Sequence, residues 1–304
     1  MLSSMVLSIP TAYVDILNKA LGDSMDVLMS YSFRVVLMGT SLLAIVAALV
    51  GSINVYKNQS LIGDAMGHSS FFGIVLAFIL IKERNPLFLL FGAMFAAGIC
   101  FYLVNFANKN SKIGADANMA ISLSGLFGLG LVLKSYIQAN PSYQKTSQAG
   151  LNNYIFGQAA YLMEADVKVI FIALLICLCI FLLFFEDFKA YIFDKNFSMM
   201  IGVNTKLLDY LILFMTILVI GVGIKAVGVI LISSFLIIPT VSASKFARSY
   251  EGLLAISSIF ALLAAFVGTF ISTAYKGFST GPSIIIAASL IGFVSFVYAI
   301  RKGK

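Results

Sequence analysis

The sequence predicts an all-α fold: a polytopic bundle of helices that crosses a membrane about eight or nine times. Hydrophobic residues make up 61% of the 304 residues, charged residues make up 11%, and the mean hydropathy is +1.01. A water-soluble domain carries about a quarter charged residues, so most of this surface faces something other than water. The apolar residues also gather in long runs without the alternation of barrel strands. In lipid such runs satisfy their backbone hydrogen bonds only as helices.

The first 30 residues differ from the rest of the chain. Apolar residues recur there at helical spacing, with charged residues between them. This pattern predicts an amphipathic helix that lies at the membrane interface over residues 1–30. The segment lacks the basic start and the long apolar core of a cleavable signal peptide. We expect residues 31–304 to form a single transmembrane domain.

The transmembrane domain contains nine apolar windows that approach the length of about 20 helical residues needed to cross a hydrocarbon core. Two of them, Asn118–Leu133 and Tyr210–Ile224, are short, so a count of eight or ten spans stays open beside nine. In chain order, the predicted spans are Val35–Tyr56, Leu61–Ile81, Leu87–Phe106, Asn118–Leu133, Val169–Phe185, Tyr210–Ile224, Ala226–Ser244, Leu253–Tyr275 and Pro282–Ile300.

The charges in the connecting segments indicate an orientation. Lys and Arg are slightly more frequent in the loops that share a side with the C-terminus, which places that side in the cytoplasm and the N-terminal helix outside. One of these cytoplasmic loops, about residues 186–208, is among the most charged stretches and is long enough for one or two short helices. It is either an ordinary solvated loop or a docking element for a soluble partner.

Other features of the composition exclude whole classes of function. The net charge of +7 is modest and spread over many loops, which argues against a nucleic-acid-binding protein. The three cysteines, Cys100, Cys177 and Cys179, all lie in apolar runs, so we interpret them as small buried residues. They form neither a disulfide framework nor a CxxC zinc site. The motifs of P-loop nucleotide binding, zinc peptidases and serine hydrolases are absent, so we expect no enzyme.

The candidate site lies in the stretch "SLIGDAMGHSS", where Asp64 and the chain's one histidine, His68, are spaced i, i+4. On a helix both side chains point to the same face. A charged group at membrane depth costs about 2.5–3.5 kcal/mol on insertion scales, so such groups normally face a bundle interior or a wet cavity. Three interpretations remain open: a pair that locks two helices together, a proton relay, or a cation site in which carboxylate and imidazole suit manganese, zinc or iron. Further ligands would come from water, a carbonyl, a hydroxyl or a second copy of the chain.

The same region resembles a known family. The segment "YKNQSLIGDAMGHSSFFGIVLAF" is similar to the signature of the manganese/zinc/iron-chelate ABC transporter permeases, with Lys57, Asp64, His68 and Gly73 at the motif positions. The resemblance continues over about 250 residues. It includes the segments "LNNYIFGQAAYLMEADV", "FDKNFSMMIGVNTKLLDYL", "AVGVILISSFLIIPTVSASKFA" and "GTFISTAYKGFSTGPSIII".

This resemblance implies a fold and a task. It implies a type II ABC importer-like helical permease in a bacterial inner membrane, paired with a second permease copy as a homodimer or with a paralogue. It implies a cytoplasmic ATPase subunit, an extracytoplasmic solute-binding protein and a transported divalent metal, with Asp64 and His68 on the metal pathway and no permanently bound cofactor. The coupling element would be about Asp194–Asn204, with Asp194, Phe197 and Gly202 in contact with the ATPase.

Two alternative functions remain open. A permease for a metal chelate or for cobalamin shares the general architecture, although an Asp–His pair argues against it. An ion-coupled secondary carrier, with Asp64 as the proton site, belongs to another class; such carriers often show internal inverted repeats, and no clear repeat is visible in this sequence. The sequence leaves the choice of metal open, with manganese favoured over zinc and iron because the pair offers a hard oxygen and no thiolate.

Overall fold

The computed structural model describes residues 26–82, 85–140, 143, 159–275 and 277–302. Most of the interfacial helix expected over residues 1–30 lies outside these ranges and stays a prediction. Within them every regular element is helical. In chain order the elements are α2 (Tyr31–Tyr56), α3 (Ile62–Ile81), α4 (Pro86–Asn110), α5 (Ala115–Ala139), the 3₁₀ turn η3 (Ala159–Tyr161), α7 (Glu164–Leu183), α8 (Phe185–Phe193), α9 (Lys195–Met200), α10 (Thr205–Val227), α11 (Val229–Ala243), α12 (Tyr250–Ala274) and α13 (Thr280–Arg301).

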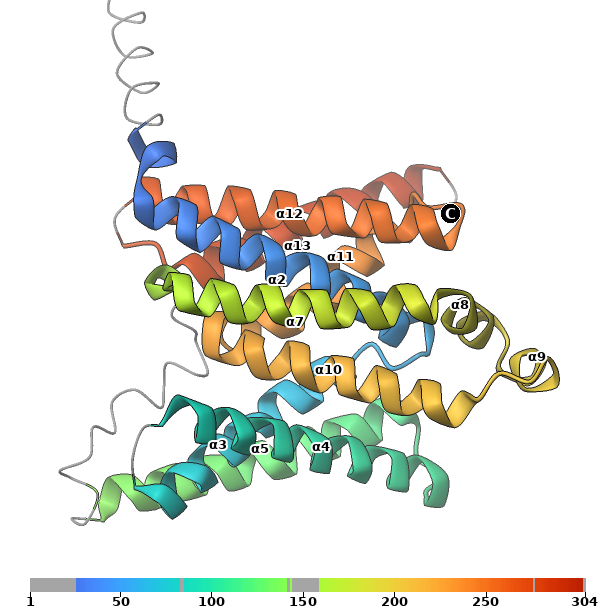
Figure 1. Cartoon of the computed structure of the whole chain (residues 1–304), viewed down its shortest axis with the longest axis horizontal. Coiled ribbons are helices and arrows are strands. Elements are labelled where there is room, and N and C mark those ends of the chain that lie inside the picture. The colour runs from blue at the N-terminus through green and yellow to red at the C-terminus, as the bar shows by residue number, and fades with distance from the viewer. Residues whose placement is uncertain (1–25, 83–84, 141–142, 144–158, 276, 303–304) are drawn as a thin grey trace, which may run out of the picture.

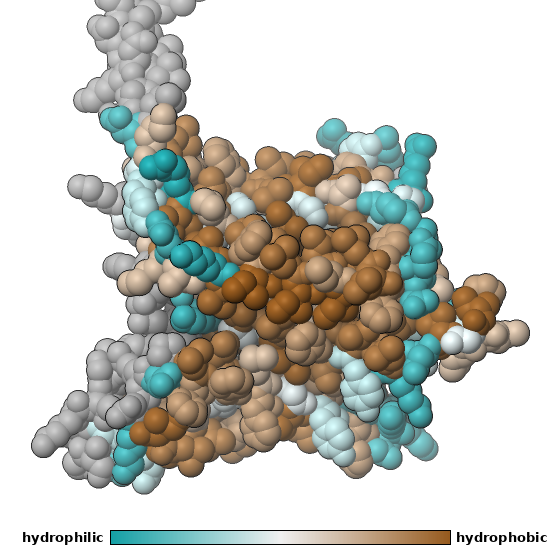
Figure 2. All heavy atoms as spheres, viewed as in Figure 1, coloured by the Kyte–Doolittle hydropathy of each residue, from teal (hydrophilic) through white to brown (hydrophobic). Residues whose placement is uncertain are grey.

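Eight of these helices are long and apolar enough to cross a membrane: α2, α3, α4, α5, α7, α10, α12 and α13. The space-filling view shows the corresponding surface, a broad apolar band with polar residues gathered at the two ends of the helices (Figure 2). Such a band between polar fringes is the surface that a bilayer requires. The all-helical, multi-pass fold predicted from the sequence is therefore confirmed.

The predicted windows differ from the helices in one informative place. The two windows that looked short belong to helices of full length, α5 with 25 residues and α10 with 23. The window Ala226–Ser244 instead contains α11, which has only 15 residues. Gly228, at φ 86°, is both the C-cap of α10 and the N-cap of α11. The chain therefore passes from one helix to the next without a loop. At 1.5 Å per residue α11 reaches only about 22 Å, less than a hydrocarbon core.

The helices form two groups (Figure 1). Helices α3, α4 and α5 pack on one another, with α3 in contact with both of the others. The second group contains α2, α7, α10, α12 and α13, and the short α11 packs against α2, α3, α10, α12 and α13. Contact on so many sides explains why α11 is apolar all round apart from a few hydroxyl side chains. The helices α8 and α9 project from the end of the bundle at which the C-terminus lies, opposite the end where α2 begins (Figure 1).

Glycine allows α3 and α4 to approach closely. A Cβ on Gly73 would lie 1.9 Å from the carbonyl oxygen of Gly92, and a Cβ on Gly92 would lie 2.4 Å from the carbonyl oxygen of Gly73. No side chain fits at such distances, so the two backbones touch directly. Small residues at helix crossings are the usual means by which transmembrane helices pack tightly. Because α3 carries the Asp64–His68 pair, this crossing fixes the helix on which the candidate site is built.

We expect Gly92→Ala to destabilise the bundle, because the added methyl group forces α3 and α4 apart. Overpacking of this kind costs about 1–3 kcal/mol. Gly98→Ala is the matched control on the same helix, since a Cβ there would meet only the Ile217 side chain at an ordinary 3.8 Å. Thermal unfolding in detergent should show a lower midpoint for Gly92→Ala alone. Equal midpoints for the two variants would contradict the direct backbone contact.

Candidate functional site

The Asp64–His68 pair lies where the sequence predicts it, on one face of α3. Asp64 is in the first turn of the helix, where the positive end of the helix dipole stabilises a negative charge. The Asp64 Oδ1 and His68 Nε2 atoms are 3.4 Å apart. The Asp64 side chain is 33% exposed and that of His68 is 22% exposed, whereas Ala65, Met66 and Gly67 between them are buried. The pair therefore occupies the open face of a helix whose other faces are packed.

Two residues from other helices surround the pair, and sequence reasoning did not find them. The ring of Phe127 in α5 meets the His68 imidazole edge to face, with centroids 5.1 Å apart. The side chain of Ser233 in α11 lies beside the Asp64 carboxylate, and its hydroxyl donates a hydrogen bond to the Ile230 carbonyl at 3.2 Å. Ser233 could have been suspected, because paired serines interrupt the apolar run of α11. Nothing in the sequence distinguishes Phe127 from the other aromatic residues of the spans.

One nitrogen of the pair lacks a hydrogen-bond partner among the described residues. The His68 Nδ1 atom is buried and has no hydrogen-bond partner among the described residues. Leaving a buried polar atom without a partner costs free energy, so this nitrogen is available to a bound ion, to water or to a group beyond the described residues. In the part of the chain that the structure describes, no third His, Cys, Asp or Glu joins Asp64 and His68. Two donors 3.4 Å apart can contact one cation at the usual distance of about 2.0–2.2 Å, but they cannot enclose it.

A second candidate region is the coupling segment, which we define as α8 and α9 with the turn that leads into α10. Asp194 caps the start of α9: its Oδ1 accepts hydrogen bonds from the backbone N–H groups of Asn196 and Phe197, each at 2.9 Å. Gly202 follows the end of α9 at φ 88°, with the two backbone hydrogen bonds of a Schellman turn, Gly202 N to Met199 O and Val203 N to Ser198 O. Asp194 and Gly202 therefore set where the short helix begins and ends.

The coupling segment presents an apolar surface outside the apolar band. We call this surface the α9 tip; its large exposed residues are Phe193, Phe197, Met199, Met200 and Ile201. Met200 is 84% exposed, more than any other large apolar side chain recorded for the described residues. In Figure 2 apolar atoms at this end of the bundle project past the polar fringe. An apolar group in that position indicates an interaction surface rather than a face that lipid covers.

Sequence comparison places these features in a family. Residues 29–299, nearly the whole chain, match the ABC 3 transport family. The chain belongs to this family. The family resemblance inferred from the motifs is therefore confirmed, and with it the assignment as a multi-pass protein of a bacterial membrane.

The relatives of this ABC 3 family member include transport proteins of several bacteria. The chain is 35% identical over 270 residues to the manganese transport system membrane protein MntC of Bacillus subtilis, a match that covers 88% of this chain and 61% of that protein. It is 32% identical over 273 residues to the zinc transport system membrane protein TroC of Treponema pallidum, covering 90% of this chain and 91% of the relative. The chain thus spans less than two thirds of the first relative and nearly all of the second.

A solved structure shows the same fold. PsaBC from Streptococcus pneumoniae, determined in complex with Fab, superposes with a TM-score of 0.76 at 24% sequence identity, covering 91% of this chain and 95% of the other. At this identity the likeness concerns the fold. It confirms that the overall arrangement of helices is shared with a solved structure and is not peculiar to this sequence.

Proposed function

We propose that this chain is the membrane-spanning permease subunit of an ATP-driven importer for a divalent transition metal. The observation that carries the proposal is the Asp64–His68 pair: a carboxylate oxygen and an imidazole nitrogen, 3.4 Å apart, on the open face of a transmembrane helix. Membership of the ABC 3 family and relatives named as manganese and zinc transport proteins support it. A site with only two donors suits transport, because a transported ion must also leave.

The proposed importer needs three kinds of partner. A second permease copy, identical or paralogous, brings a second pair of donors and completes the coordination of the ion. A cytoplasmic ATPase binds the α9 tip, so ATP hydrolysis takes place on a separate chain and this subunit is not itself an enzyme. An extracytoplasmic solute-binding protein delivers the metal. The metal is cargo in this scheme, and no cofactor is bound permanently.

Manganese is the favoured cargo, with zinc and iron next. The pair provides one hard carboxylate and one imidazole, and within the described residues no thiolate gathers beside it. Oxygen-rich coordination suits manganese, whereas a tight zinc site usually gathers more His or Cys ligands. Affinity alone favours zinc over manganese at any such site, so selectivity for manganese would have to come from geometry and from the delivering protein.

Uptake by the reconstituted complex tests the proposal. We expect vesicles that contain the chain, its ATPase and its solute-binding protein to accumulate radiolabelled manganese when ATP is present. We also expect excess unlabelled manganese to compete with labelled zinc. Vesicles that lack the ATPase are the control and should accumulate nothing. Zinc uptake that excess manganese does not affect would show that zinc is the cargo, and metal uptake without the ATPase would favour a secondary carrier.

A further inference from the structure

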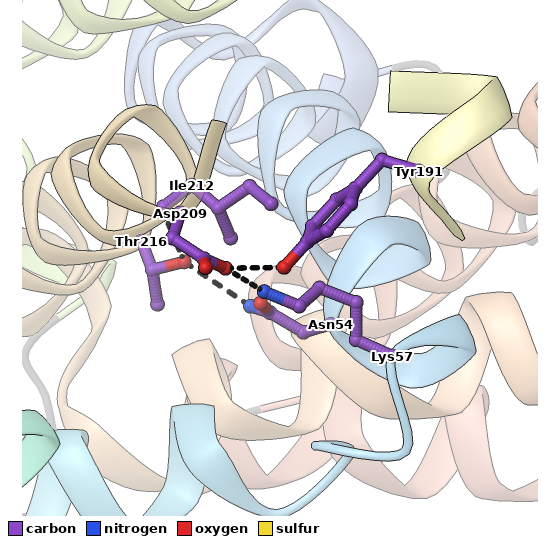
Figure 3. Close-up of polar contacts among 6 residues, drawn as sticks. All are labelled: Asn54, Lys57, Tyr191, Asp209, Ile212 and Thr216. Carbon is purple, nitrogen blue, oxygen red and sulfur yellow. Dashed lines mark hydrogen bonds and ion pairs between the residues drawn. The ribbon is translucent and has the colours of Figure 1, made fainter. Parts of the chain in front are cut away.

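A polar cluster joins three elements at the end of the bundle that carries the coupling segment (Figure 3). The Asp209 Oδ1 atom of α10 accepts a hydrogen bond from the Lys57 Nζ atom, just after α2, and another from the Tyr191 hydroxyl of α8. Both distances are 2.6 Å. Figure 3 shows the Lys57 and Tyr191 side chains pointing toward the same carboxylate, one from the turn after α2 and the other from α8. We call these three residues the Asp209 cluster.

The two donors of the Asp209 cluster are largely shielded from water, whereas the shared carboxylate is not. The Lys57 side chain is 13% exposed and Tyr191 is buried, but the Asp209 side chain is 39% exposed. Burial lowers the pKa of the Lys57 ammonium in spite of its contact with Asp209, and burial together with the nearby carboxylate raises the pKa of the Tyr191 phenol. The phenol therefore stays protonated and donates its hydrogen bond. Charges that are partly desolvated in this way fix a geometry, because each partner is costly to leave without the other.

The chain between Lys57 and the Asp64–His68 pair is short and is held by backbone hydrogen bonds. Residues 58–61 link α2 to α3, and Asp64 lies in the first turn of α3. Asn58 adopts a left-handed conformation at φ 56°, the Gln59 N–H donates to the Asn54 carbonyl at 2.9 Å, and the Ile62 N–H donates to the Gln59 carbonyl at 3.0 Å. A displacement of Lys57 therefore reaches α3 through a hydrogen-bonded turn rather than through a flexible loop.

The opposite side of the cluster connects to the coupling segment. Tyr191 lies in α8, immediately before α9, and Asp209 lies in the first turns of α10, immediately after the Schellman turn at Gly202. The α9 tip thus lies in the chain between Tyr191 and Asp209, and these two residues are hydrogen-bonded to each other. A second link, from Asn54 Nδ2 to Thr216 Oγ1 at 3.1 Å, ties α2 to α10 deeper in the bundle (Figure 3).

We infer that Lys57, Tyr191 and Asp209 are positioning residues that transmit movement of the coupling segment to α3 and so to Asp64 and His68. The inference rests on the proposed function, because it assumes that an ATPase moves the α9 tip. It predicts that weakening the cluster uncouples the two activities of the complex: ATP hydrolysis continues while metal transport fails. A cluster that merely holds the fold together would instead lower both activities in parallel.

The test compares manganese uptake and ATP hydrolysis in the same vesicles of the intact complex. Tyr191→Phe removes one hydroxyl and keeps the ring, and Lys57→Met keeps much of the stem and removes the charge. We expect each to lower the metal transported per ATP by about tenfold, the change that loss of one charge-assisted hydrogen bond produces. Lys57→Arg should restore most of this ratio. Uptake and hydrolysis that fall together, or a ratio equal to wild type, would overturn the inference.

Lys225→Met is the matched control. It breaks an ion pair of similar length, Lys225 Nζ to Asp166 Oδ1 at 2.8 Å, which joins α10 to α7 at the opposite end of the bundle. This variant should keep the wild-type ratio of metal to ATP. A ratio that falls as far as in Tyr191→Phe would show that any lost ion pair of α10 uncouples transport, and the assignment to the Asp209 cluster would be wrong.

A second readout separates this inference from the proposed function. Leu61, at the start of α3, is 41% exposed. In a background without the three native cysteines, a Leu61→Cys variant of the complex should react with a maleimide at different rates before and after ATP and vanadate are added. Tyr191→Phe should abolish that difference, and a difference that persists would overturn the inference whatever is transported. A wild-type complex that hydrolyses ATP without accumulating metal would overturn only the proposed function.

Discussion

Replacing either Asp64 or His68 by alanine is expected to abolish metal uptake by the assembled complex. Each variant removes one of the two donors of the proposed metal site, and the described part of the chain offers no other His, Cys, Asp or Glu beside them. Loss of a group that only supports a ligand lowers metal affinity by about 10–100-fold, so loss of the ligand itself should lower uptake by at least about 100-fold. Radiolabelled manganese accumulation, measured at equal amounts of purified complex, checks the prediction.

The control for these variants is Asp116→Ala. Asp116 also lies in the first turn of a spanning helix, α5, but it is exposed and is not part of the pair. Asp116→Ala should leave uptake near wild type, and all three variants should assemble with the ATPase, because none of the substituted residues belongs to the α9 tip. Near-normal uptake of manganese, zinc and iron by Asp64→Ala and His68→Ala would remove these residues from the metal pathway.

A charged residue in the α9 tip should detach the ATPase. Phe197 is 53% exposed and Met200 is 84% exposed, and both belong to α9, which projects from the end of the bundle (Figure 1). Burying one such side chain in an interface contributes about 1.5–3 kcal/mol, and a carboxylate in its place adds a desolvation cost. We expect the double variant Phe197→Asp, Met200→Asp to raise the dissociation constant for the ATPase by at least about 100-fold. Co-purification of the ATPase with the detergent-solubilised chain measures this directly.

The matched control for the α9 tip is Met29→Asp. Met29 is 67% exposed and lies at the end of the bundle where α2 begins, opposite the coupling segment. It should keep the ATPase bound. If the double variant in the α9 tip co-purified with as much ATPase as wild type, the docking surface would lie elsewhere on this face of the membrane. The thermal unfolding midpoint should be unchanged in both variants, because the substituted side chains make few contacts within the chain.

The sequence by itself determined the fold class, most of the spans and the candidate pair. Hydropathy is a local property, so eight of the nine predicted windows fall on helices long enough to span a membrane, although they were found without knowledge of their neighbours. The i, i+4 spacing of Asp64 and His68 is also local, because one helix is enough to bring the two side chains together. The family motif at Lys57, Asp64 and His68 added the expected task of the chain, the transport of a divalent metal.

Only the tertiary structure decided what surrounds these local features. Gly228 makes α11 too short to be a span, which composition could not reveal because α11 is as apolar as its neighbours. Ser233 and Phe127 lie beside the Asp64–His68 pair and come from helices distant in sequence. Lys57 and Asp209 are separated by 152 positions, and each alone resembles an ordinary loop charge. Their contact depends on how whole helices pack, and helix packing follows from the combined shapes of many side chains rather than from any local pattern.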